Sequence, residues 1–474
     1  MNRLVNVSNR VALPNANLSA GGLAVGLLSA MRESGGVWFG WNGRTTPDDR
    51  EDPPTIQVHE GIRFATVSLP VTLHDRCYNG FANGTLWPLL HYFLDGFRFQ
   101  DEEYAAYLEV NSRFAQSLHP LTRESDLIWV HDYHLIPLAE KLRNLGVRAR
   151  LGFFLHVPFP QFEVLRALPP VRELIRALLA YDLVGFQTDA DRDSFLEAVE
   201  VLWGDEARIA GDSVRLRDHT LRVGVFPIGV DVDEIAKSAA VAAMSPRVQR
   251  MTRGLAGRRL IIGADRLDYS KGLLERFEAY RRFLELSPEH LGHVTYLQIA
   301  PLGRQEVKAY ARIRDALERK AGRINGAFAD IDWTPIRYLN RNFPHEVLPG
   351  MLRESHVGLV TPVRDGMNLV AKEFIAAQDP ADPGVLILSD RAGAANELRD
   401  ALLINPYDTL GIATAIRTAL HMPLAERQAR HERMEKTLRR NSIHVWRDTF
   451  LDALRDAGPS AAARAGAGLS AAAR

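Results

Sequence analysis

The chain lacks several features that would place it in large classes of protein. Cys77 is its one cysteine, so no disulfide can form within the chain, which suits a reducing cytoplasm. No apolar run approaches the ~18 residues that a membrane-spanning helix needs. Lys and Arg number 58, and Asp and Glu also number 58, so we expect neither nucleic acid nor a membrane as a partner. An apolar strand pattern starts at once, at residues 4–8, so we expect no signal peptide.

The length of the chain favours two domains, because 474 residues are too many for one core. Short apolar runs alternate with helical stretches in both halves of the chain, and this alternation predicts an α/β fold with two parallel sheets covered by helices. We expect strands at residues 4–8, 126–131, 150–155, 182–186, 259–264, 294–299, 357–361 and 385–388.

The boundary between the halves falls in a segment with Pro227 and Gly229, which predicts a hinge over residues 227–233. We therefore expect one domain over residues 1–230 and a second over 231–443. Residues 444–456 have the pattern of an amphipathic helix. Residues 457–474 are almost entirely Ala, Gly, Ser and Arg, which cannot bury a core, so they predict a disordered tail.

Residues 357–378 carry the strongest functional signal. An apolar run over 357–363 predicts a buried strand, Arg364–Asn368 form a polar turn, and residues 369–378 predict a helix with the charged pair Lys372 and Glu373. A helix that begins beyond the carboxyl end of a parallel strand offers free backbone N–H groups to a phosphate. Glu373, one turn into the helix, could accept hydrogen bonds from a ribose diol. The alternative is a core strand and helix joined by a solvated turn.

A similar arrangement lies a hundred residues earlier. A strand pattern ends at Ala264, and the following loop carries Arg266 and Lys271 before a helix that starts at Gly272. Two cations and a helix N-terminus could hold a diphosphate, although the chain has no GxxxxGK[ST] sequence. A surface loop with an internal ion pair, such as Arg266 with Asp268, remains the alternative.

The N-terminal half has a second collection of polar residues. Arg10 ends the first strand, and Gly22 belongs to a glycine-rich helix start that could approach a phosphate or sugar closely. Asp132 lies between His131 and His134, but this spacing matches no common metal motif and we predict no metal site. Three aromatic residues could hold a sugar or belong to the core, namely Trp41, Tyr78 and Trp87.

Several long motifs resemble those of the trehalose-6-phosphate synthases, over residues from about Asn2 to about Leu454. They are LWPLLHY (86–92), WVHDYHL (129–135), FFLHVPFP (153–160), YDLVGFQT (181–188), RLDYSKG (266–272) and RDGMNLVAKE (364–373). The resemblance implies a GT-B architecture, with two facing Rossmann-like domains and an active site in the cleft between them. It implies that residues 1–230 bind the acceptor, that residues 231–443 bind the nucleotide sugar, and that the helix over 444–456 packs back on the N-terminal domain. It also implies a retaining transfer of glucose from UDP-glucose to glucose 6-phosphate, which gives α,α-trehalose 6-phosphate and UDP without a cofactor or metal.

The same resemblance implies roles for individual residues. The catalytic group is Arg266, Lys271, Asp365 and His156, which neutralise the diphosphate and fix the donor glucose. The donor-binding group is Gly22, Arg266, Lys271, Leu348, Gly366, Met367, Asn368, Leu369 and Glu373. The acceptor-binding group is Arg10, Trp41, Tyr78, Trp87, Asp132 and Arg304, with the two arginines on the phosphate.

Three other functions remain open. A glucosylglycerol-phosphate synthase of the same fold would use glycerol 3-phosphate as its acceptor. A catalytically silent sugar-phosphate sensor should have lost one of Arg266, Lys271 and Glu373, and all three are present. A glycogen-phosphorylase-like enzyme would need a lysine for pyridoxal phosphate. The nucleobase of the donor and assembly into a homo-oligomer also stay open.

Overall fold

The computed structural model describes residues 2–13, 28, 31, 36–47, 53–217, 219–301, 308–344 and 347–457. These residues fall into two compact units. The described residues as far as Pro227, together with those from Trp446 onward, form the N-terminal unit, and Ile228–Val445 form the C-terminal unit. The chain therefore passes from the N-terminal unit to the C-terminal unit between Pro227 and Ile228, inside the segment 227–233. Whether this segment acts as a hinge stays a prediction.

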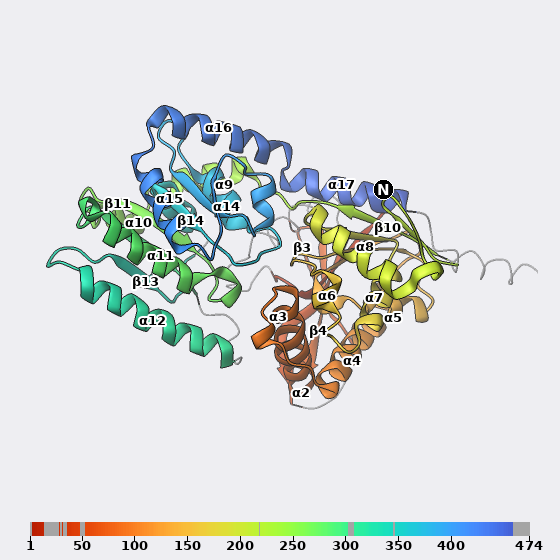
Figure 1. Cartoon of the computed structure of the whole chain (residues 1–474). Helices are drawn as coiled ribbons and strands as arrows, with labels where there is room; N and C mark the ends of the chain where they lie inside the picture. Colours follow the sequence, from red (N-terminus) through yellow and green to blue (C-terminus); the bar gives the residue numbers. More distant parts are fainter. Residues whose placement is uncertain are drawn as a thin grey trace, which may run out of the picture. The chain divides into compact units, whose positions relative to one another are not determined.

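The N-terminal unit is built on a ten-stranded sheet (Figure 1). Its strands follow one another in space as β3 (Thr55–His59), β4 (Ile62–Pro70), β2 (Gly36–Thr46), β1 (Leu4–Arg10), β5 (Leu127–His131), β6 (Arg150–Phe154), β7 (Leu183–Phe186), β10 (Thr220–Val225), β9 (Ser213–Arg215) and β8 (Arg208–Ala210). The strands from β4 to β10 run parallel. At one edge β3 pairs antiparallel with β4, and at the other edge β9 pairs antiparallel with both β10 and β8. The expected parallel sheet is confirmed, but it also contains β2, β4 and β10 and antiparallel edge strands, which were not expected.

Helix α17 (Ile443–Asp456) covers part of this sheet. Its Phe450 ring stacks on Trp129 of β5 with centroids 4.5 Å apart. Gly152 and Gly185 make room for this ring, because a Cβ added to either would lie within 2.9 Å of it. Further helical segments of this unit are α2 (Val71–His74), the π-helical η1 (Asp75–Leu86), α3 (Trp87–Leu90), α4 (Asp101–Leu118), α5 (Leu138–Asn144), α6 (Phe162–Leu165), α7 (Val171–Leu179) and α8 (Asp189–Trp203).

The C-terminal unit has a six-stranded sheet in which every pair of neighbours is parallel. The spatial order is β13 (Ile336–Leu339), β12 (Val294–Ile299), β11 (Arg259–Ala264), β14 (Val357–Val360), β15 (Val385–Ser389) and β16 (Leu402–Ile404). The expected strands over 259–264, 294–299, 357–361 and 385–388 are all present. Pro362 follows the end of β14 closely and has no N–H group to extend the pairing.

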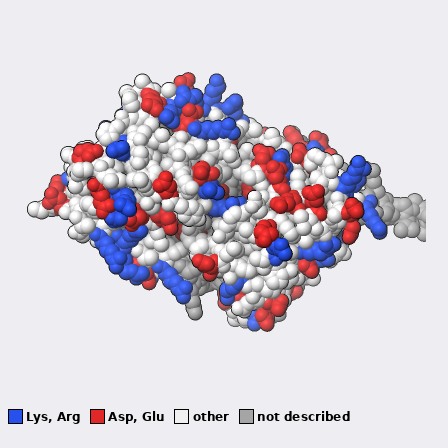
Figure 2. Space-filling view, viewed as in Figure 1, with Lys and Arg blue, Asp and Glu red and all other residues white. Residues whose placement is uncertain are grey.

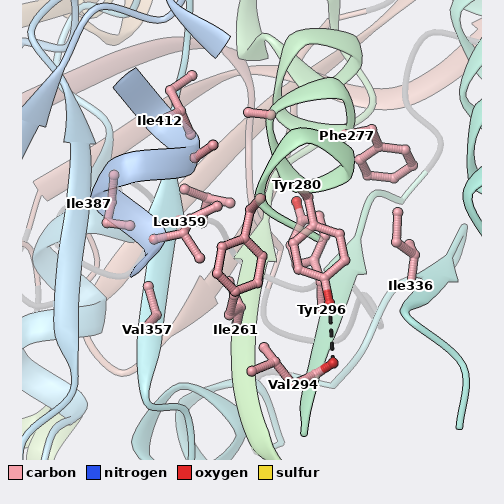
Figure 3. Packing of buried hydrophobic residues seen from close by; sticks show 14 of the residues in the cluster. Ile261, Phe277, Tyr280, Val294, Tyr296, Ile336, Val357, Leu359, Ile387 and Ile412 are labelled. Atoms are coloured by element: carbon pink, nitrogen blue, oxygen red, sulfur yellow. Dashed lines mark hydrogen bonds between the residues drawn. The ribbon is translucent and has the colours of Figure 1, made fainter. Parts of the chain in front are cut away.

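Helices α11 (Leu273–Leu286), α12 (Lys308–Phe328) and α15 (Thr409–His421) bury one apolar cluster against this sheet (Figure 3). Tyr280 of α11 lies inside the cluster, and its hydroxyl donates to the Val294 carbonyl at 3.2 Å. Burial of each large side chain stabilises the unit by about 1.5–3 kcal/mol. Further helices of the unit are α9 (Val232–Ala243), α10 (Pro246–Arg253), α13 (Leu348–Arg353), α14 (Leu369–Ala377) and α16 (Leu424–Arg440).

The folded part of the chain extends one residue further than expected. Ala457, which the sequence analysis assigns to the tail, is 1% exposed, and its N–H donates to the Ala453 carbonyl at 3.0 Å. It therefore continues α17. Residues 458–474 lie outside the described part of the chain.

Candidate active site

Both sheets reverse their strand order at one point, and the candidate residues follow the strands that flank it. The reversal lies between β1 and β5 in the N-terminal unit and between β11 and β14 in the C-terminal unit. In open α/β sheets, ligands bind beyond the carboxyl ends of the strands at such a point. Arg10 ends β1 and Asp132 follows β5, while Arg266 and Lys271 follow β11 and Asp365 follows β14. Each unit thus brings distant parts of the sequence to a place where a ligand can bind.

In the C-terminal unit, Lys271 and Asp365 form the centre of this group. The Lys271 Nζ donates to the Asp365 Oδ2 at 2.5 Å, and the side chains are 12% and 14% exposed. The Asn368 Nδ2 donates to the same oxygen at 3.0 Å. The Asp365 carboxylate therefore joins the loop after β11 to the turn after β14, which the sequence analysis treated as two separate motifs.

The loop that carries Arg266 and Lys271 has a defined local structure. Asp268 accepts from the Ser270 N–H at 2.9 Å and from the Tyr310 hydroxyl at 2.9 Å. Gly272 has φ +62°, and a Cβ there would lie 2.4 Å from the Thr361 carbonyl oxygen, so only glycine fits this close approach. Arg266 is exposed, which leaves its guanidinium within reach of a ligand.

Arg276 supports this loop, and the sequence analysis missed it. The guanidinium is fully buried and donates to the Asp265 carboxylate at 2.5 Å, the Thr361 hydroxyl at 2.9 Å and the Lys271 carbonyl at 3.2 Å. It thereby fixes the loop after β11 to the end of β14. A signal was present in the sequence, because Arg276 falls on the apolar face of α11 beside Phe277, where a cation is expensive unless it is paired.

The turn before α14 is also held by specific contacts. Asn368 has φ +76°, and its Oδ1 accepts from the Ala371 N–H at 3.1 Å, so it caps the helix that begins at Leu369. The Gly366 carbonyl oxygen lies so close to Gly393 that a Cβ there would come within 2.0 Å. Met367 is buried and its carbonyl accepts from the Ala394 N–H at 2.8 Å.

Two further candidates lie at helix positions in the same unit. Glu373 lies one turn into α14 and is half-buried. Leu348 is the first residue of α13 and is also half-buried. Both are therefore placed on rigid elements, which suits a binding role, and the role itself stays a prediction.

Lys372, which the sequence analysis placed in a charged pair with Glu373, has a different environment. It is fully buried, forms an ion pair with Glu397 and donates to the Ile228 carbonyl at 2.7 Å. The other Glu397 oxygen accepts from the Asn441 Nδ2 at 2.6 Å. Burial lowers the pKa of the Lys372 ammonium, and Glu397 opposes this shift. Lys372 therefore ties α14 to the residues at the start of the C-terminal unit.

In the N-terminal unit, His156 belongs to a chain of hydrogen-bonded side chains. Its Nε2 lies 3.1 Å from the His131 Nδ1, and the His131 Nε2 lies 2.6 Å from the Asn6 Oδ1. Burial lowers the pKa of His156 to about 3 and the pKa of His131 well below its ordinary value. Asp132 has φ +75°, and its Oδ1 accepts from the His156 N–H at 3.3 Å. His156 and Asp132 were candidates from the sequence, and their roles stay predictions; Asn6 was not among the candidates.

The aromatic candidates divide into accessible and covered residues. Tyr78 is half-buried, and its ring stacks on His134 with centroids 5.7 Å apart. Arg10 is exposed and lies 5.7 Å from the centre of the Trp41 ring. Trp41 and Trp87 are only 8% and 4% exposed, so both face neighbouring protein groups over most of their surface.

Some candidates cannot be placed. Gly22 and Arg304 lie outside the described residues. Within the described ranges, no group of three His, Cys, Asp or Glu side chains is arranged to hold a metal ion. In that same part of the chain, no helix combines the length and the hydropathy that crossing a membrane requires. Figure 2 shows acidic and basic side chains interspersed over the visible face.

Comparison with known proteins identifies the family. The chain matches the model of glycosyltransferase family 20 over residues 6–456. It therefore belongs to glycosyltransferase family 20 and is a glycosyltransferase with the two parallel-sheet units of the GT-B class. The resemblance noted in the sequence is thereby confirmed.

Individual relatives are more specific. The chain is 49% identical to the trehalose-6-phosphate synthase of Enterobacter sp. (strain 638), with 97% of this chain and 96% of that protein covered. It is 48% identical to a UDP-forming trehalose-phosphate synthase from Burkholderia xenovorans in complex with glucose-6-phosphate, with a TM-score of 0.91 and coverage of 96% and 100%. An E. coli structure bound with UDP-2-fluoro glucose is 47% identical, with a TM-score of 0.92 and the same coverage.

Proposed function

We propose that the protein transfers glucose from UDP-glucose to glucose 6-phosphate with retention at the anomeric carbon, and forms α,α-trehalose 6-phosphate and UDP. The group of Lys271, Asp365 and Asn368 at the strand reversal of the C-terminal unit is the observation that carries this proposal. It combines a cation, a helix N-terminus and a carboxylate where a nucleotide sugar is expected to bind. The relatives bound to a sugar phosphate and to a UDP-glucose analogue support the choice of substrates.

The donor would be held mainly by the C-terminal unit. Arg266 and Lys271 neutralise the diphosphate, and this interaction strengthens as negative charge develops on the leaving group. Backbone N–H groups from Gly366 to Leu369 add to it, and Glu373 accepts from the ribose. The remaining donor contacts in the proposal are Gly22, Leu348, Met367 and Asn368.

The acceptor would be held mainly by residues of the N-terminal unit. Arg10 binds the phosphate, and Arg304 is the second phosphate ligand in the proposal. Asp132 and Tyr78 lie beside the sugar, with Trp41 and Trp87 behind them. His156 and Asp365 orient the donor glucose.

The chemistry follows from the charges of these groups. The bond between the glucose C1 and the diphosphate oxygen breaks, a bond forms from C1 to the acceptor oxygen on the same face, and the acceptor proton passes to the leaving phosphate. The Asp365 carboxylate already accepts from Lys271 and Asn368, which suits orientation of a hydroxyl better than nucleophilic attack. Alignment of the two substrates then supplies much of the rate.

A nucleotide-release assay tests the proposal directly. UDP-, ADP- and GDP-glucose are each combined with glucose 6-phosphate or with glycerol 3-phosphate, and the sugar product is identified. We expect turnover with UDP-glucose and glucose 6-phosphate to exceed every other combination. Faster turnover with glycerol 3-phosphate would assign the protein to the glucosylglycerol-phosphate synthases, and no turnover with any pair would favour a sensor.

The same proposal includes a cytoplasmic location, where phosphorylated sugars and nucleotide sugars are retained by their charge. The single cysteine is consistent with this, because Cys77 is buried and burial raises the pKa of its thiol to about 12. Such a thiol stays protonated and unreactive.

A further inference from the structure

We infer that Asn6 and His131 set the tautomer of His156, so that its Nδ1 carries no proton and accepts a hydrogen bond from a sugar hydroxyl. Asn6 and His131 are then positioning residues, since neither needs to touch the substrate. The identification of the ligand as a sugar hydroxyl rests on the proposed function. The tautomer itself does not, because it follows from contacts within the N-terminal unit.

The chain of side chains begins at a buried residue. Asn6 lies on the central strand β1 and is 0% exposed. Its amide oxygen lies 2.6 Å from the His131 Nε2. An amide oxygen can only accept a hydrogen bond, so with the Asn6 amide in this orientation the His131 Nε2 carries the proton.

The charge state of His131 determines the role of its other ring nitrogen. Its ring is 1% exposed, and burial lowers its pKa well below the ordinary value of 6.5, so it is neutral near pH 7. A neutral imidazole has one protonated nitrogen, and that nitrogen is Nε2. The Nδ1 is therefore an acceptor. Because it lies 3.1 Å from the His156 Nε2, the proton of that contact must belong to His156.

The protonation state of His156 follows from this contact. Burial lowers its pKa to about 3, so it is also neutral and holds its single proton on Nε2. Its Nδ1 is then a bare nitrogen that needs a donor. Asp132 restrains the backbone beside it by accepting the His156 N–H at 3.3 Å. His156 is half-buried, so part of the residue remains open to a ligand.

This arrangement has a consequence for specificity. A bare nitrogen accepts from a sugar hydroxyl, but it gains nothing from a fluorine or a hydrogen in the same place. Losing one such hydrogen bond weakens binding by about 0.5–1.5 kcal/mol, which is roughly twofold to tenfold. Asn6 thus influences sugar recognition from a buried position on another strand.

The tautomer can be measured without substrate. Histidine labelled with ¹⁵N is incorporated into the whole chain, and the His156 and His131 signals are assigned from the variants His156→Gln and His131→Gln. Long-range proton–nitrogen spectra separate protonated from bare ring nitrogens. We expect both rings to carry the proton on Nε2. A His156 ring protonated on Nδ1 would overturn the inference, because the hydrogen-bond chain would then run in the opposite direction.

A variant of Asn6 tests the cause. Asn6→Leu removes the acceptor, so the His156 signals should shift towards a mixture of tautomers while the chain stays folded. An unchanged tautomer in a folded Asn6→Leu protein would show that Asn6 does not set it.

Substrate analogues connect the tautomer to recognition. UDP-glucose derivatives with fluorine in place of one hydroxyl at a time are compared in the wild-type protein and in His156→Gln. We expect one hydroxyl position of the glucose at which fluorine raises the donor KM by about fivefold in the wild type and by much less in His156→Gln. Equal penalties in both proteins at every position would separate His156 from the sugar, whereas inactivity of the wild type with UDP-glucose would instead reject the proposed function.

Discussion

The two units bury different kinds of polar groups near the equivalent point of their sheets. In the N-terminal unit, Asn6, His131 and His156 are uncharged and linked in series. In the C-terminal unit, Lys271 with Asp365 and Lys372 with Glu397 are ion pairs with little exposure to solvent. The strand order that positions these groups is the same, so the fold alone does not determine the chemistry. The difference matches the parts of the ligands that these groups are proposed to meet, because a glucose ring presents hydroxyl groups and a diphosphate presents negative charge.

The ion pairs of the C-terminal unit and the neutral hydrogen-bond chain of the N-terminal unit also differ in their energetic cost. A buried ion pair carries a large desolvation cost, and removal of one partner leaves the other charge exposed to that cost alone. A neutral hydrogen-bond chain carries a smaller cost, but it imposes a direction along which each donor must meet an acceptor. We therefore expect mutations in the C-terminal unit to have the larger effects, and those in the N-terminal unit to act through proton placement.

The largest expected effect follows the loss of Lys372. Lys372→Met leaves the Glu397 carboxylate without its cation in a site where Lys372 is 0% exposed. Breaking a buried pair in this way typically destabilises by about 3–5 kcal/mol. Thermal and urea unfolding of the wild type and the variant measure this loss.

A double variant shows whether the lost stability comes from the unpaired charge or from the changed packing. Lys372→Met with Glu397→Leu removes both charges and should recover much of the lost stability. If Lys372→Met unfolds at the same urea concentration as the wild type, then the buried ion pair contributes little to the free energy of unfolding. The expected energetic difference between the ion pairs and the neutral hydrogen-bond chain would then be wrong.

The next effect concerns turnover. Lys271→Ala and Arg266→Ala should each lower kcat by roughly 10²-fold or more at saturating donor, because in the proposed mechanism each removes a charge that acts on the departing diphosphate. Arg282→Ala serves as the control, since Arg282 is an exposed arginine on the adjacent helix α11. Steady-state kinetics with UDP-glucose measure all three. Near-normal turnover in either of the first two variants would remove that residue from the catalytic group.

The sequence predicted the charged region better than the neutral one, for a physical reason. Strands β11 and β14 are short apolar runs, and the cations after β11 and the turn after β14 are local patterns that a phosphate site requires. Lys372 and Arg276 also lie in these segments, but their burial depends on partners such as Glu397 and Thr361 that are distant in the sequence.

The hydrogen-bond chain of the N-terminal unit depends on such distant contacts throughout. Asn6 and His131 are 125 residues apart, and nothing near either residue indicates the other. Strand β2 was also missed, because its aromatic residues resemble a sugar platform as much as a strand. Parallel neighbours are joined through long connections, so their side-chain contacts are the part of the structure that local patterns predict least well.

A smaller effect concerns pH and the neutral histidines. The pKa of His156 is lowered to about 3 and that of His131 is also lowered, whereas both would titrate near 6.5 in the unfolded chain. Below pH 6.5 the unfolded chain therefore binds more protons than the folded chain. Their contribution to stability is fully present above pH 6.5 and is lost as the pH falls towards 3, by at most about 1.4 kcal/mol per pH unit for each histidine.

Urea unfolding between pH 7.5 and pH 5 measures this slope. His131→Gln removes one of the two titrating groups and should make the pH dependence shallower, although its stability at pH 7.5 also changes. If this variant kept the full wild-type dependence of stability on pH, then His131 would not be a neutral, buried histidine. The contrast between the neutral groups of the N-terminal unit and the ion pairs of the C-terminal unit would then be weaker.

The smallest expected effect lies at the end of the chain, away from both groups. Residues 458–474 contain one large apolar side chain, Leu469, so they can bury very little. Their removal should change neither the melting temperature nor kcat. Removal of Ala457 as well should destabilise by about 0.8 kcal/mol or less, because this residue is 1% exposed at the end of α17 and contributes one buried methyl group. A comparison of the two truncated proteins by thermal unfolding therefore tests where the folded N-terminal unit ends. A clear loss of activity on removing residues 458–474 alone would mean that this segment contributes to the neutral group of the N-terminal unit or to the charged group of the C-terminal unit. The division of the polar residues into these two groups would then be incomplete.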